Sequence, residues 1–228
     1  MTKNIQEILD SYPESYAADR LRLNYKKYLS SEEGKKITAE LFHFLKPFII
    51  NKDNLSDIVK AQLLYTIIIK SITYNKGEKS KSYNDMRYSF VGCIAYKKAV
   101  CMGIAELYTL LGSALGLKVI TVIGHGSNEP HAWNIIWLNS NGKLTPYHID
   151  ATWDLGKFGT LADKFDYFLK SDDYMRKHSH SWISERYPGC PEDRKSFSKI
   201  PHKIVDGTCA YFNQMQRRLK DIKFRKAG

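Results

Sequence analysis

The chain has 228 residues, of which 43% are hydrophobic and 26% charged, the balance of a globular protein with a substantial core. Fifteen tyrosines and four tryptophans argue against a disordered chain, and the longest apolar run, Ala61–Ile69, is too short to span a bilayer. The N-terminal segment contains acidic residues and no apolar stretch, so no signal peptide is expected. A cytoplasmic location is therefore the default, unless the chain is cut from a longer secreted precursor.

Residues 1–73 are expected to be mainly helical, and the last helix of this part covers about residues 56–71. It carries a broad apolar stripe and has Asn54 or Ser56 as its N-cap. The polar segment that follows, Asn75–Ser89, is predicted to be a loop. A loop of this length can act as a lid over a neighbouring site.

A helical pattern begins at Cys101, with apolar residues recurring at helical spacing, interrupted by Gly112 and ended by Gly116. Free N–H groups and the positive end of the helix dipole favour an anion at this helix start. A thiol at that position ionises more easily, and the thiolate is the nucleophilic form of cysteine. Burial as an ordinary core residue is the alternative for Cys101.

The period then changes to short β-branched and aromatic segments bounded by Gly, Asn and Pro. Strands are expected at Lys118–Gly124, Ala132–Leu138 and Lys143–Asp150, forming an antiparallel meander packed on the helix. After Trp153 the pattern returns to loops and helices, including one helix capped by Ser171. Helices followed by strands and again by helices, without a repeat or a long linker, indicate one α+β domain.

The turn between the second and third of these strands provides a geometric test. If Asn139–Gly142 forms the loop, Leu138 faces Lys143, and counting outward along both strands brings His131 opposite Asp150. Facing residues on one side of a hairpin have Cβ atoms about 4.5–5.5 Å apart, close enough for the carboxylate to accept the imidazole N–H. A slip of one residue would move the two side chains to opposite faces.

Cys101, His131 and Asp150 then supply a nucleophile, a base and a group that orients the base. The segments around them, KKAVCMGIAELYTLLGSALGLKVITVIG, HAWNIIW and YHIDATWD, resemble the signature blocks of the transglutaminase-like superfamily, which shares the papain-like cysteine-protease architecture. The resemblance is specific over residues 88–154 and weaker on both sides. It implies that these three residues form the catalytic triad of a small stand-alone member.

The resemblance also implies a papain-like core, in which the nucleophile helix packs on an antiparallel β-sheet and further helices lie at both ends. We expect a single domain over residues 1–228, with a helical N-terminal part (1–73), a catalytic core (88–154), and C-terminal helices with a basic tail (155–228). The implied chemistry is thiol-dependent attack on a protein or peptide amide through a thioester. The acceptor stays open between an amine, as in a transglutaminase, and water, as in a cysteine peptidase or amidase. No EF-hand-like acidic loop is visible, and neither calcium nor another cofactor is expected.

Several other side chains are candidates for the site. In the family an aromatic donor upstream of the cysteine usually helps to bind the oxyanion, which favours Tyr88; a half-buried core tyrosine is the alternative. Trp133 and Trp153 flank the histidine and the aspartate and either exclude water from the site or simply pack in the core. His125 and His148 have no evident carboxylate partner, so neither is expected to be catalytic.

The net charge of +11 is unevenly distributed, because residues 192–203 and 216–228 are strongly basic. This segment could hold an acidic partner, so a non-catalytic binding module is an alternative function, although a solvated helix face is the simpler interpretation. No nucleic-acid-binding motif accompanies it, so specific nucleic-acid binding is not expected. Four cysteines without a CxxC pair argue against a disulfide framework and a structural zinc site. Two metal sites are weaker alternatives. One would use Cys101 and His131, and the other would use the scattered residues His178, His180, Cys190 and Cys209.

Overall fold

The computed structural model describes residues 31–50, 55–77, 86–140, 142–156, 165–194, 197 and 200–219, together with Asp19, Arg22 and Lys26. Its helices, with 3-10 turns labelled η, are α3 (Glu32–Ile50), α4 (Asp57–Ser71), η2 (Met86–Tyr88), α5 (Phe90–Tyr96), α6 (Cys101–Ala114), α7 (Asp172–Lys177), η3 (Ser184–Arg186) and α8 (His202–Leu219). Its strands are β1 (Thr73–Tyr74), β2 (Lys98–Ala99), β3 (Lys118–Gly126), β4 (Glu129–Ser140), β5 (Lys143–Ile149), β6 (Phe168–Lys170) and β7 (His180–Ser181). The α+β class predicted from the sequence is confirmed.

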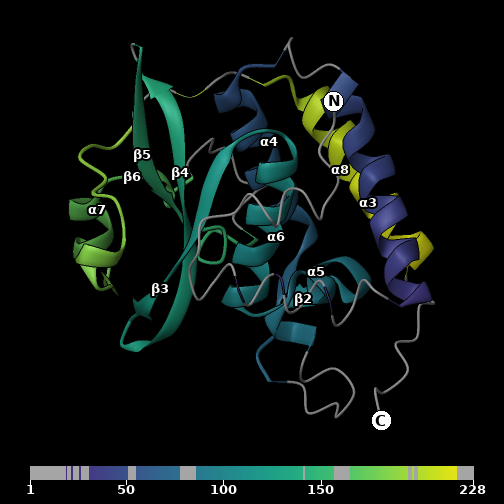
Figure 1. Cartoon of the computed structure of the whole chain (residues 1–228), viewed down its shortest axis with the longest axis horizontal. Coiled ribbons are helices and arrows are strands. Elements are labelled where there is room, and N and C mark those ends of the chain that lie inside the picture. The colour runs from purple at the N-terminus through teal and green to yellow at the C-terminus, as the bar shows by residue number, and fades with distance from the viewer. Residues whose placement is uncertain are drawn as a thin grey trace.

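A five-stranded antiparallel sheet in the order β6-β5-β4-β3-β7 lies on one side of the helical layers (Figure 1). β3, β4 and β5 form the meander that the alternation predicts, and β3 and β4 are longer than predicted. The sequence pattern does not predict β6 and β7, which extend the sheet at its two edges. Strands of two or three residues are too short to show an alternating pattern.

The hairpin formed by β4 and β5 is tighter than predicted. Ser140 pairs with Lys143, so only positions 141 and 142 separate the two strands. The predicted loop Asn139–Gly142 is therefore two residues too long, and the predicted facing of His131 and Asp150 is wrong by two positions. Because side chains alternate with a period of two, a shift of two positions leaves both of them on the predicted face. His131 is thus a diagonal neighbour of Asp150, which directly follows β5.

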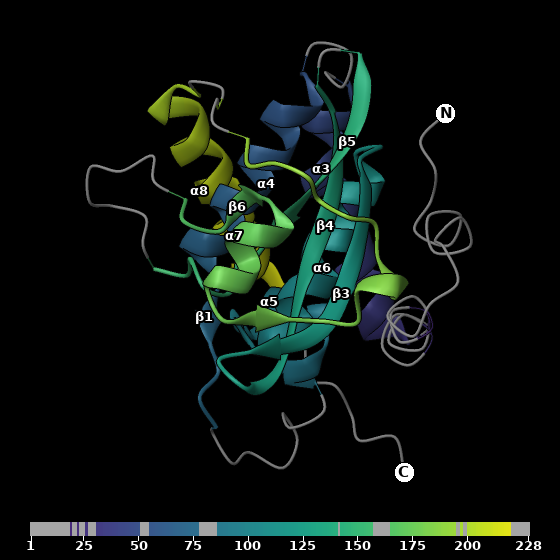
Figure 2. The ribbon, with the colours of Figure 1, turned by 90° about the vertical axis from the view of Figure 1, so that its left-hand side faces the viewer.

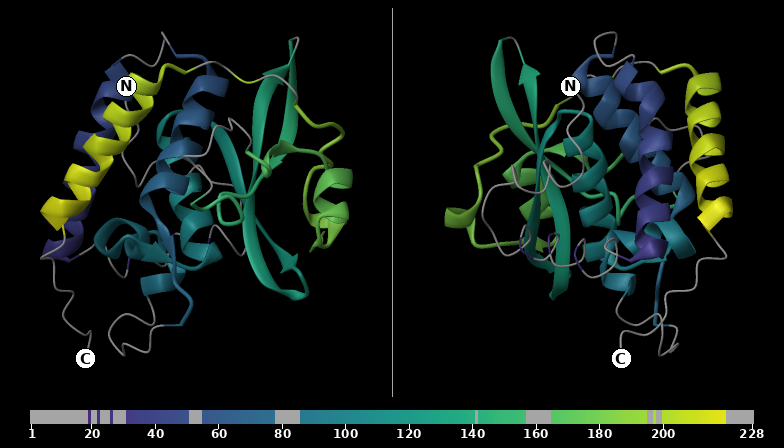
Figure 3. Two further views of the ribbon diagram at one scale, coloured as in Figure 1. Left: turned by 180° about the vertical axis from the view of Figure 1, so that it is seen from behind. Right: turned by 45° about the vertical axis from the view of Figure 1, so that its right-hand side comes forward.

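Helices cover the two faces of the sheet unequally. α6 packs on β3 and β4, α4 packs on α6, and α8 contacts both α4 and α3 on the side away from the sheet (Figures 1 and 3). α7 lies against the opposite face of the sheet, in front of it in Figure 2, where Met175 packs with Val122 and Trp133. The position of α4 between α6 and α8 explains its broad apolar stripe, because nearly all of its side chains from Lys60 to Ile69 are buried.

Asn134 on β4 fixes α6 to the sheet. Its buried side-chain amide donates to the carbonyl oxygen of Ala105 and to the hydroxyl of Thr109, both at 3.0 Å on α6. The same amide lies 3.3 Å from the carbonyl oxygen of Ile120 on β3. One side chain thereby sets the position of α6, which begins at Cys101, relative to the strand that carries His131.

α6 is a continuous helix, so the predicted interruption at Gly112 is wrong. A Cβ atom at Gly112 would lie 2.9 Å from a methyl group of Val119, so the glycine lets the helix approach β3 closely. The helix ends as predicted: Leu115 is the C-cap, and Gly116 follows with a φ of +82°, a conformation that glycine adopts without strain.

α5 is a short helix that the sequence pattern does not predict. It lies in the segment that leads to Cys101 and packs on α6. The carboxylate of Glu106 on α6 is buried and accepts a hydrogen bond from the backbone N–H of Phe90 at the start of α5 (3.3 Å). A carboxylate at a helix N-terminus is favourable, which gives this buried charge a structural role.

The C-terminal helix is joined to the N-terminal part of the chain by an ion pair. The guanidinium of Arg218 on α8 lies 2.7 and 2.8 Å from one carboxylate oxygen of Glu40 on α3.

Positions 220–228 of the basic tail and 78–85 of the candidate lid lie outside the described residues. Among the helices that the structure describes, none has both the length and the apolar composition required to cross a bilayer.

Candidate active site

Cys101 is the first residue of α6, directly after the N-cap Val100, whose side chain cannot bond the N–H groups of the first turn. The side chain of Cys101 packs against Ala105 and Ala132, and the residue is 9% exposed. The positive end of the helix dipole therefore acts on a thiol in a largely apolar environment.

The chain that precedes α5 passes closely over the first turn of α6. A Cβ atom at Gly103 would lie 2.6 Å from the carbonyl oxygen of Ser89 and 2.9 Å from that of Arg87, so only glycine fits there. The N–H of Val100 donates to the carbonyl oxygen of Arg87 (2.9 Å). These contacts hold η2, and with it Tyr88, beside the N-terminus of the nucleophile helix.

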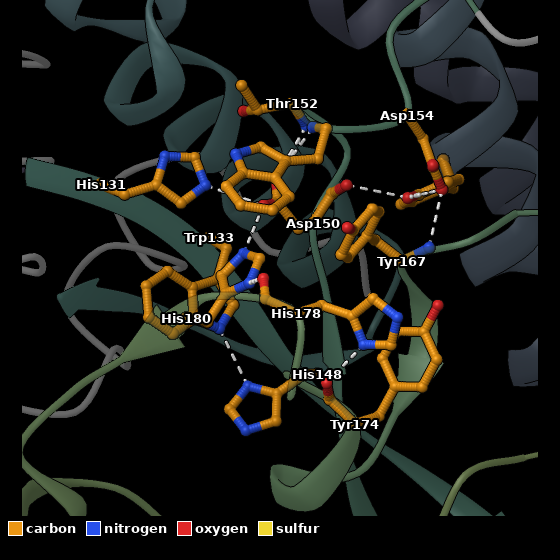
Figure 4. Close-up of polar contacts among 12 residues, drawn as sticks. His131, Trp133, His148, Asp150, Thr152, Asp154, Tyr167, Tyr174, His178 and His180 are labelled. Carbon is orange, nitrogen blue, oxygen red and sulfur yellow. Dashed lines mark hydrogen bonds and ion pairs between the residues drawn. The ribbon is translucent and has the colours of Figure 1, made fainter. Parts of the chain in front are cut away.

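His131 and Asp150 are joined by a hydrogen bond of 2.7 Å between Nε2 and Oδ2 (Figure 4). Because Nε2 is taken by the carboxylate, Nδ1 is the nitrogen left to interact with Cys101. Burial alone would lower the pKa of His131, but the charge and hydrogen bond of Asp150 and a contact with the Cys101 side chain outweigh burial and raise the pKa. The structure thus brings the three predicted residues together, in the order thiol, imidazole and carboxylate.

Asp150 is fully buried and each of its carboxylate oxygens has its own partners. Oδ1 accepts the backbone N–H groups of Thr152 (2.9 Å) and Trp153 (3.3 Å), while Oδ2 accepts His131 and also His180 Nε2 (3.0 Å). Burial would raise the pKa of Asp150, but the charges and hydrogen bonds of the two histidines lower it. The carboxylate is therefore held as an anion in one orientation.

His180 is a site residue that sequence reasoning assigned only to a possible zinc set. It lies on β7, whose two residues pair with His125 and Gly126 at the end of β3. This pairing brings the ring onto Asp150 from a segment 30 positions further along the chain. No sequence signal connects the two, because the contact depends on a strand too short to be recognised.

His148 has a carboxylate partner, which corrects the prediction that it has none. Its Nε2 lies 2.8 Å from Oδ1 of Asp172, and its Nδ1 accepts the indole N–H of Trp133 at 2.9 Å. Because an indole N–H can only donate, Nδ1 carries no proton and Nε2–H donates to Asp172. Burial lowers the pKa of His148, in agreement with this neutral form. The expectation that His148 is not catalytic stays a prediction.

Aromatic rings surround His131. Trp133 is buried and stacks on the imidazole with ring centres 5.7 Å apart and an angle of 22°, and Trp153 lies at the same distance with an angle of 39°. A Cβ atom at Gly126 would lie 2.8 Å from the Trp153 ring and 3.0 Å from the His131 ring. Both tryptophans therefore lie directly beside the imidazole of His131.

Two tyrosines lie near the thiol. Tyr88, the predicted oxyanion donor, is 41% exposed, and its hydroxyl accepts a hydrogen bond from Arg87 (3.2 Å). Tyr74, which the sequence analysis missed, interacts through its hydroxyl with the Cys101 side chain, and burial followed by the charge of Cys101 raises its pKa. Tyr74 reaches this position through the parallel pairing of β1 with β2, where it lies beside Ala99.

Two sets of described residues have the spacing of a metal site: His131, Asp150 and His180 in one, and His148, Asp172 and Cys190 in the other. In the first set a metal on both Nε2 atoms would replace the two hydrogen bonds to Asp150. In the second, a metal on His148 would move its proton to Nδ1, which already faces the donor of Trp133. A metal at either set would thus compete with hydrogen bonds that these imidazoles already make.

Residues 49–148 match the model of the transglutaminase-like superfamily core. This part of the chain is similar to the transglutaminase-like superfamily. The match contains Cys101 and His131, and Asp150 lies two positions beyond its end. No curated protein matches the chain.

Two solved structures are similar to this chain. One is described as a "putative cysteine protease" from Cytophaga hutchinsonii, with 18% identity, a TM-score of 0.35, and coverage of 68% of this chain and 44% of the other. The second is described as a TGase, with 15% identity, a TM-score of 0.40, and coverage of 79% of this chain and 48% of the other. The alignments therefore span slightly less than half of either structure, and at these TM-scores they carry no argument about function.

Proposed function

We propose that this transglutaminase-like protein is a thiol-dependent enzyme that acts on protein or peptide amides through Cys101, His131 and Asp150. The observation that carries the proposal is the 2.7 Å bond from His131 Nε2 to a fully buried Asp150. This bond leaves Nδ1 for a cysteine that begins a helix. The arrangement can hold a thiolate and an imidazolium as an ion pair.

In the first half-reaction the Cys101 thiolate attacks the amide carbonyl carbon, and a tetrahedral oxyanion forms. The C–N bond then breaks as His131 Nδ1–H protonates the departing nitrogen, which leaves an acyl thioester and a neutral imidazole. We expect the backbone N–H of Cys101 to stabilise the oxyanion together with a tyrosine hydroxyl, either that of Tyr74, which interacts with the Cys101 side chain, or that of Tyr88.

In the second half-reaction an amine or a water molecule attacks the thioester while His131 Nδ1 accepts its proton. The C–S bond breaks and Cys101 leaves as the thiolate beside the renewed imidazolium. With an amine the product is a new amide, and with water it is a carboxylic acid. Transglutaminase-like acyl transfer and peptidase or amidase hydrolysis thus share every residue of this site, and the acceptor distinguishes them.

The first test follows the alkylation of each cysteine by iodoacetamide as a function of pH, read separately by peptide mass. Burial raises the pKa of Cys93, Cys190 and Cys209, that of Cys209 to about 11, so these three should react slowly below pH 8. Cys101 should react well below pH 7. His131→Ala should slow Cys101 by about 100-fold at pH 6.5, because an ordinary thiol is only about 1% ionised there.

His125→Ala is the matched control, because His125 is an exposed histidine on the neighbouring strand and should leave the reactivity of Cys101 unchanged. If Cys101 titrates like the other cysteines in the wild-type chain, or is protected until the protein unfolds, the proposal is wrong. A positive result leads to amide substrates incubated with and without a primary amine, where mass shifts separate transfer from hydrolysis.

The binding-module alternative rests on the basic C-terminal segment. Arg218 is already paired with Glu40, so replacing it would disturb the packing of α8 on α3 as well as the surface charge. A test of this alternative therefore replaces Lys223, Arg225 and Lys226 and keeps Arg218. Loss of an acidic partner in that variant, together with binding that survives Cys101→Ala, would favour a binding module over the enzyme.

A further inference from the structure

His180 lies at the centre of the ring cluster in Figure 4, and its side chain is fully buried. The residue before it, Ser179, has a φ of +63°, so the chain turns sharply between α7 and β7. This turn places His180 Nδ1 2.9 Å from the carbonyl oxygen of His178 and Nε2 3.0 Å from Oδ2 of Asp150.

Both ring nitrogens of His180 therefore face acceptors. A carbonyl oxygen and an ionised carboxylate can only accept, so both contacts are hydrogen bonds only when both nitrogens carry a proton. The ring that fits this environment is the imidazolium. The aromatic rings of Trp153 and Trp133, with centres 4.2 and 5.1 Å away, surround it and suit a cation.

Four titratable groups face His180 from the elements around it. These are Asp150 after β5, His131 on β4, His148 on β5 and Tyr167 before β6. His148 is held neutral by its bond from Trp133, and a tyrosine hydroxyl is neutral near pH 7. The charges that act on His180 are thus those of Asp150 and, when protonated, His131.

We propose that His180 is a positioning residue that shares Asp150 with His131 as a second imidazolium. The inference rests on the proposed thiol chemistry, because it concerns what happens when His131 gives up its proton. At that step Asp150 loses one cationic partner while it is fully buried, and a buried unpaired carboxylate is costly. His180 keeps the carboxylate paired and oriented through the whole cycle.

The second cation also affects the strength of His131 as an acid. Two imidazolium rings 5.5 Å apart that share one oxygen repel each other, so His180 opposes the protonated form of His131. Proton donation to the leaving nitrogen becomes easier than it would be with Asp150 bound to His131 alone. Removal of the His180 charge should therefore make His131 retain its proton to higher pH.

The test uses His180→Gln, whose amide can still donate to Asp150 but carries no charge. Iodoacetate is an anion and iodoacetamide is neutral. The ratio of their alkylation rates at Cys101 therefore falls as His131 loses its proton and its positive charge. We expect the pH of this fall to increase by about one unit in His180→Gln. His180→Phe keeps a ring without either N–H and should combine the same shift with slower alkylation. His125→Gln, the same change at an exposed site, should match the wild type.

The outcomes separate the two proposals. A wild-type Cys101 that reacts like Cys209 overturns the proposed function and this inference together. The inference alone is overturned if the wild-type chain has the thiolate–imidazolium pair but the rate ratio of His180→Gln follows the same pH profile as that of the wild type. Should the variants not fold, nitrogen-15 NMR of the wild-type chain at pH 7 gives the answer. Two protons on the His180 ring are expected, and one proton would refute the assignment.

Discussion

The His131–Asp150 and His148–Asp172 pairs have hydrogen bonds of nearly equal length, 2.7 and 2.8 Å, and their histidines lie on neighbouring strands of the same sheet. They differ in what faces the other ring nitrogen. Nδ1 of His148 accepts the indole N–H of Trp133, which fixes one proton on the ring. The remaining nitrogen of His131 faces a thiol, with which a proton can be exchanged.

The two carboxylates also differ in their burial and in their hydrogen-bond partners. Asp150 is fully buried and receives two imidazoles and two backbone N–H groups. The Asp172 side chain is 29% exposed and also accepts the backbone N–H of Cys190 (3.1 Å). A histidine–aspartate bond therefore indicates chemistry only when the second nitrogen of the ring meets a group that can give or take a proton.

Asp150→Asn and Asp172→Asn should separate the two pairs most strongly. An amide at position 150 cannot support an imidazolium, so turnover of an amide substrate should fall about 10³–10⁴-fold. The matched change at Asp172 should keep turnover within a few-fold of the wild type. Rates per folded molecule, with folding checked by circular dichroism, measure the contrast, and equal losses in the two variants would show that the pairs are not distinct.

Gly126→Ala and Gly112→Ala give the next largest contrast. A methyl group at position 126 would press on the His131 and Trp153 rings, and a misplaced base should slow Cys101 alkylation or turnover by about 10–100-fold. At position 112 the methyl group meets Val119 and Leu117, away from the His131 ring, so it should lower the free energy of unfolding by about 1–3 kcal/mol without slowing the chemistry. Kinetics and urea unfolding on the same samples show whether the effects divide in this way.

Trp133→Phe removes the donor that keeps His148 neutral while it retains a ring beside His131. The Nδ1 acceptor of His148 is then buried without its partner, which should reduce the free energy of unfolding at pH 8 by about 1–3 kcal/mol. At pH 5.5 the freed Nδ1 can take up a proton beside Asp172, so the loss should be smaller. A loss that is the same at both pH values would contradict the assigned tautomer.

The smallest expected effect is the pH dependence contributed by His148. Its pKa is lowered in the folded chain, so as the pH falls the unfolded chain binds this proton first and the folded state loses stability. His148→Gln should remove that part of the acid-side loss between pH 7 and 5. The raised pKa of His131 acts in the opposite sense, because its contribution to stability is present at low pH and lost as the pH rises through the folded value. Urea midpoints of His148→Gln and His131→Gln between pH 5 and 10 check these two signs.

The contrast also explains which parts of the molecule could be predicted from the sequence. The nucleophile helix, the meander and the His131–Asp150 contact follow from local periodicity and one turn, and the two-residue error in register left the contact intact because the period is two. His180, Tyr74 and Asp172 reach the site through two-residue strands and a short helix, and their partners are far away in the sequence. Tertiary packing alone determines those contacts, so no local sequence pattern predicts them.

The protonation state of His131 in the wild-type chain tests the central claim most directly. Nitrogen-15 NMR at pH 7, before and after Cys101 is alkylated with iodoacetamide, reports both ring nitrogens. We expect His131 to be doubly protonated before alkylation. Once the thiolate is capped, the pKa of His131 should fall, while His148 should remain neutral before and after alkylation. A His131 ring that is neutral before alkylation and unchanged after it would contradict the thiolate–imidazolium pair on which the account depends.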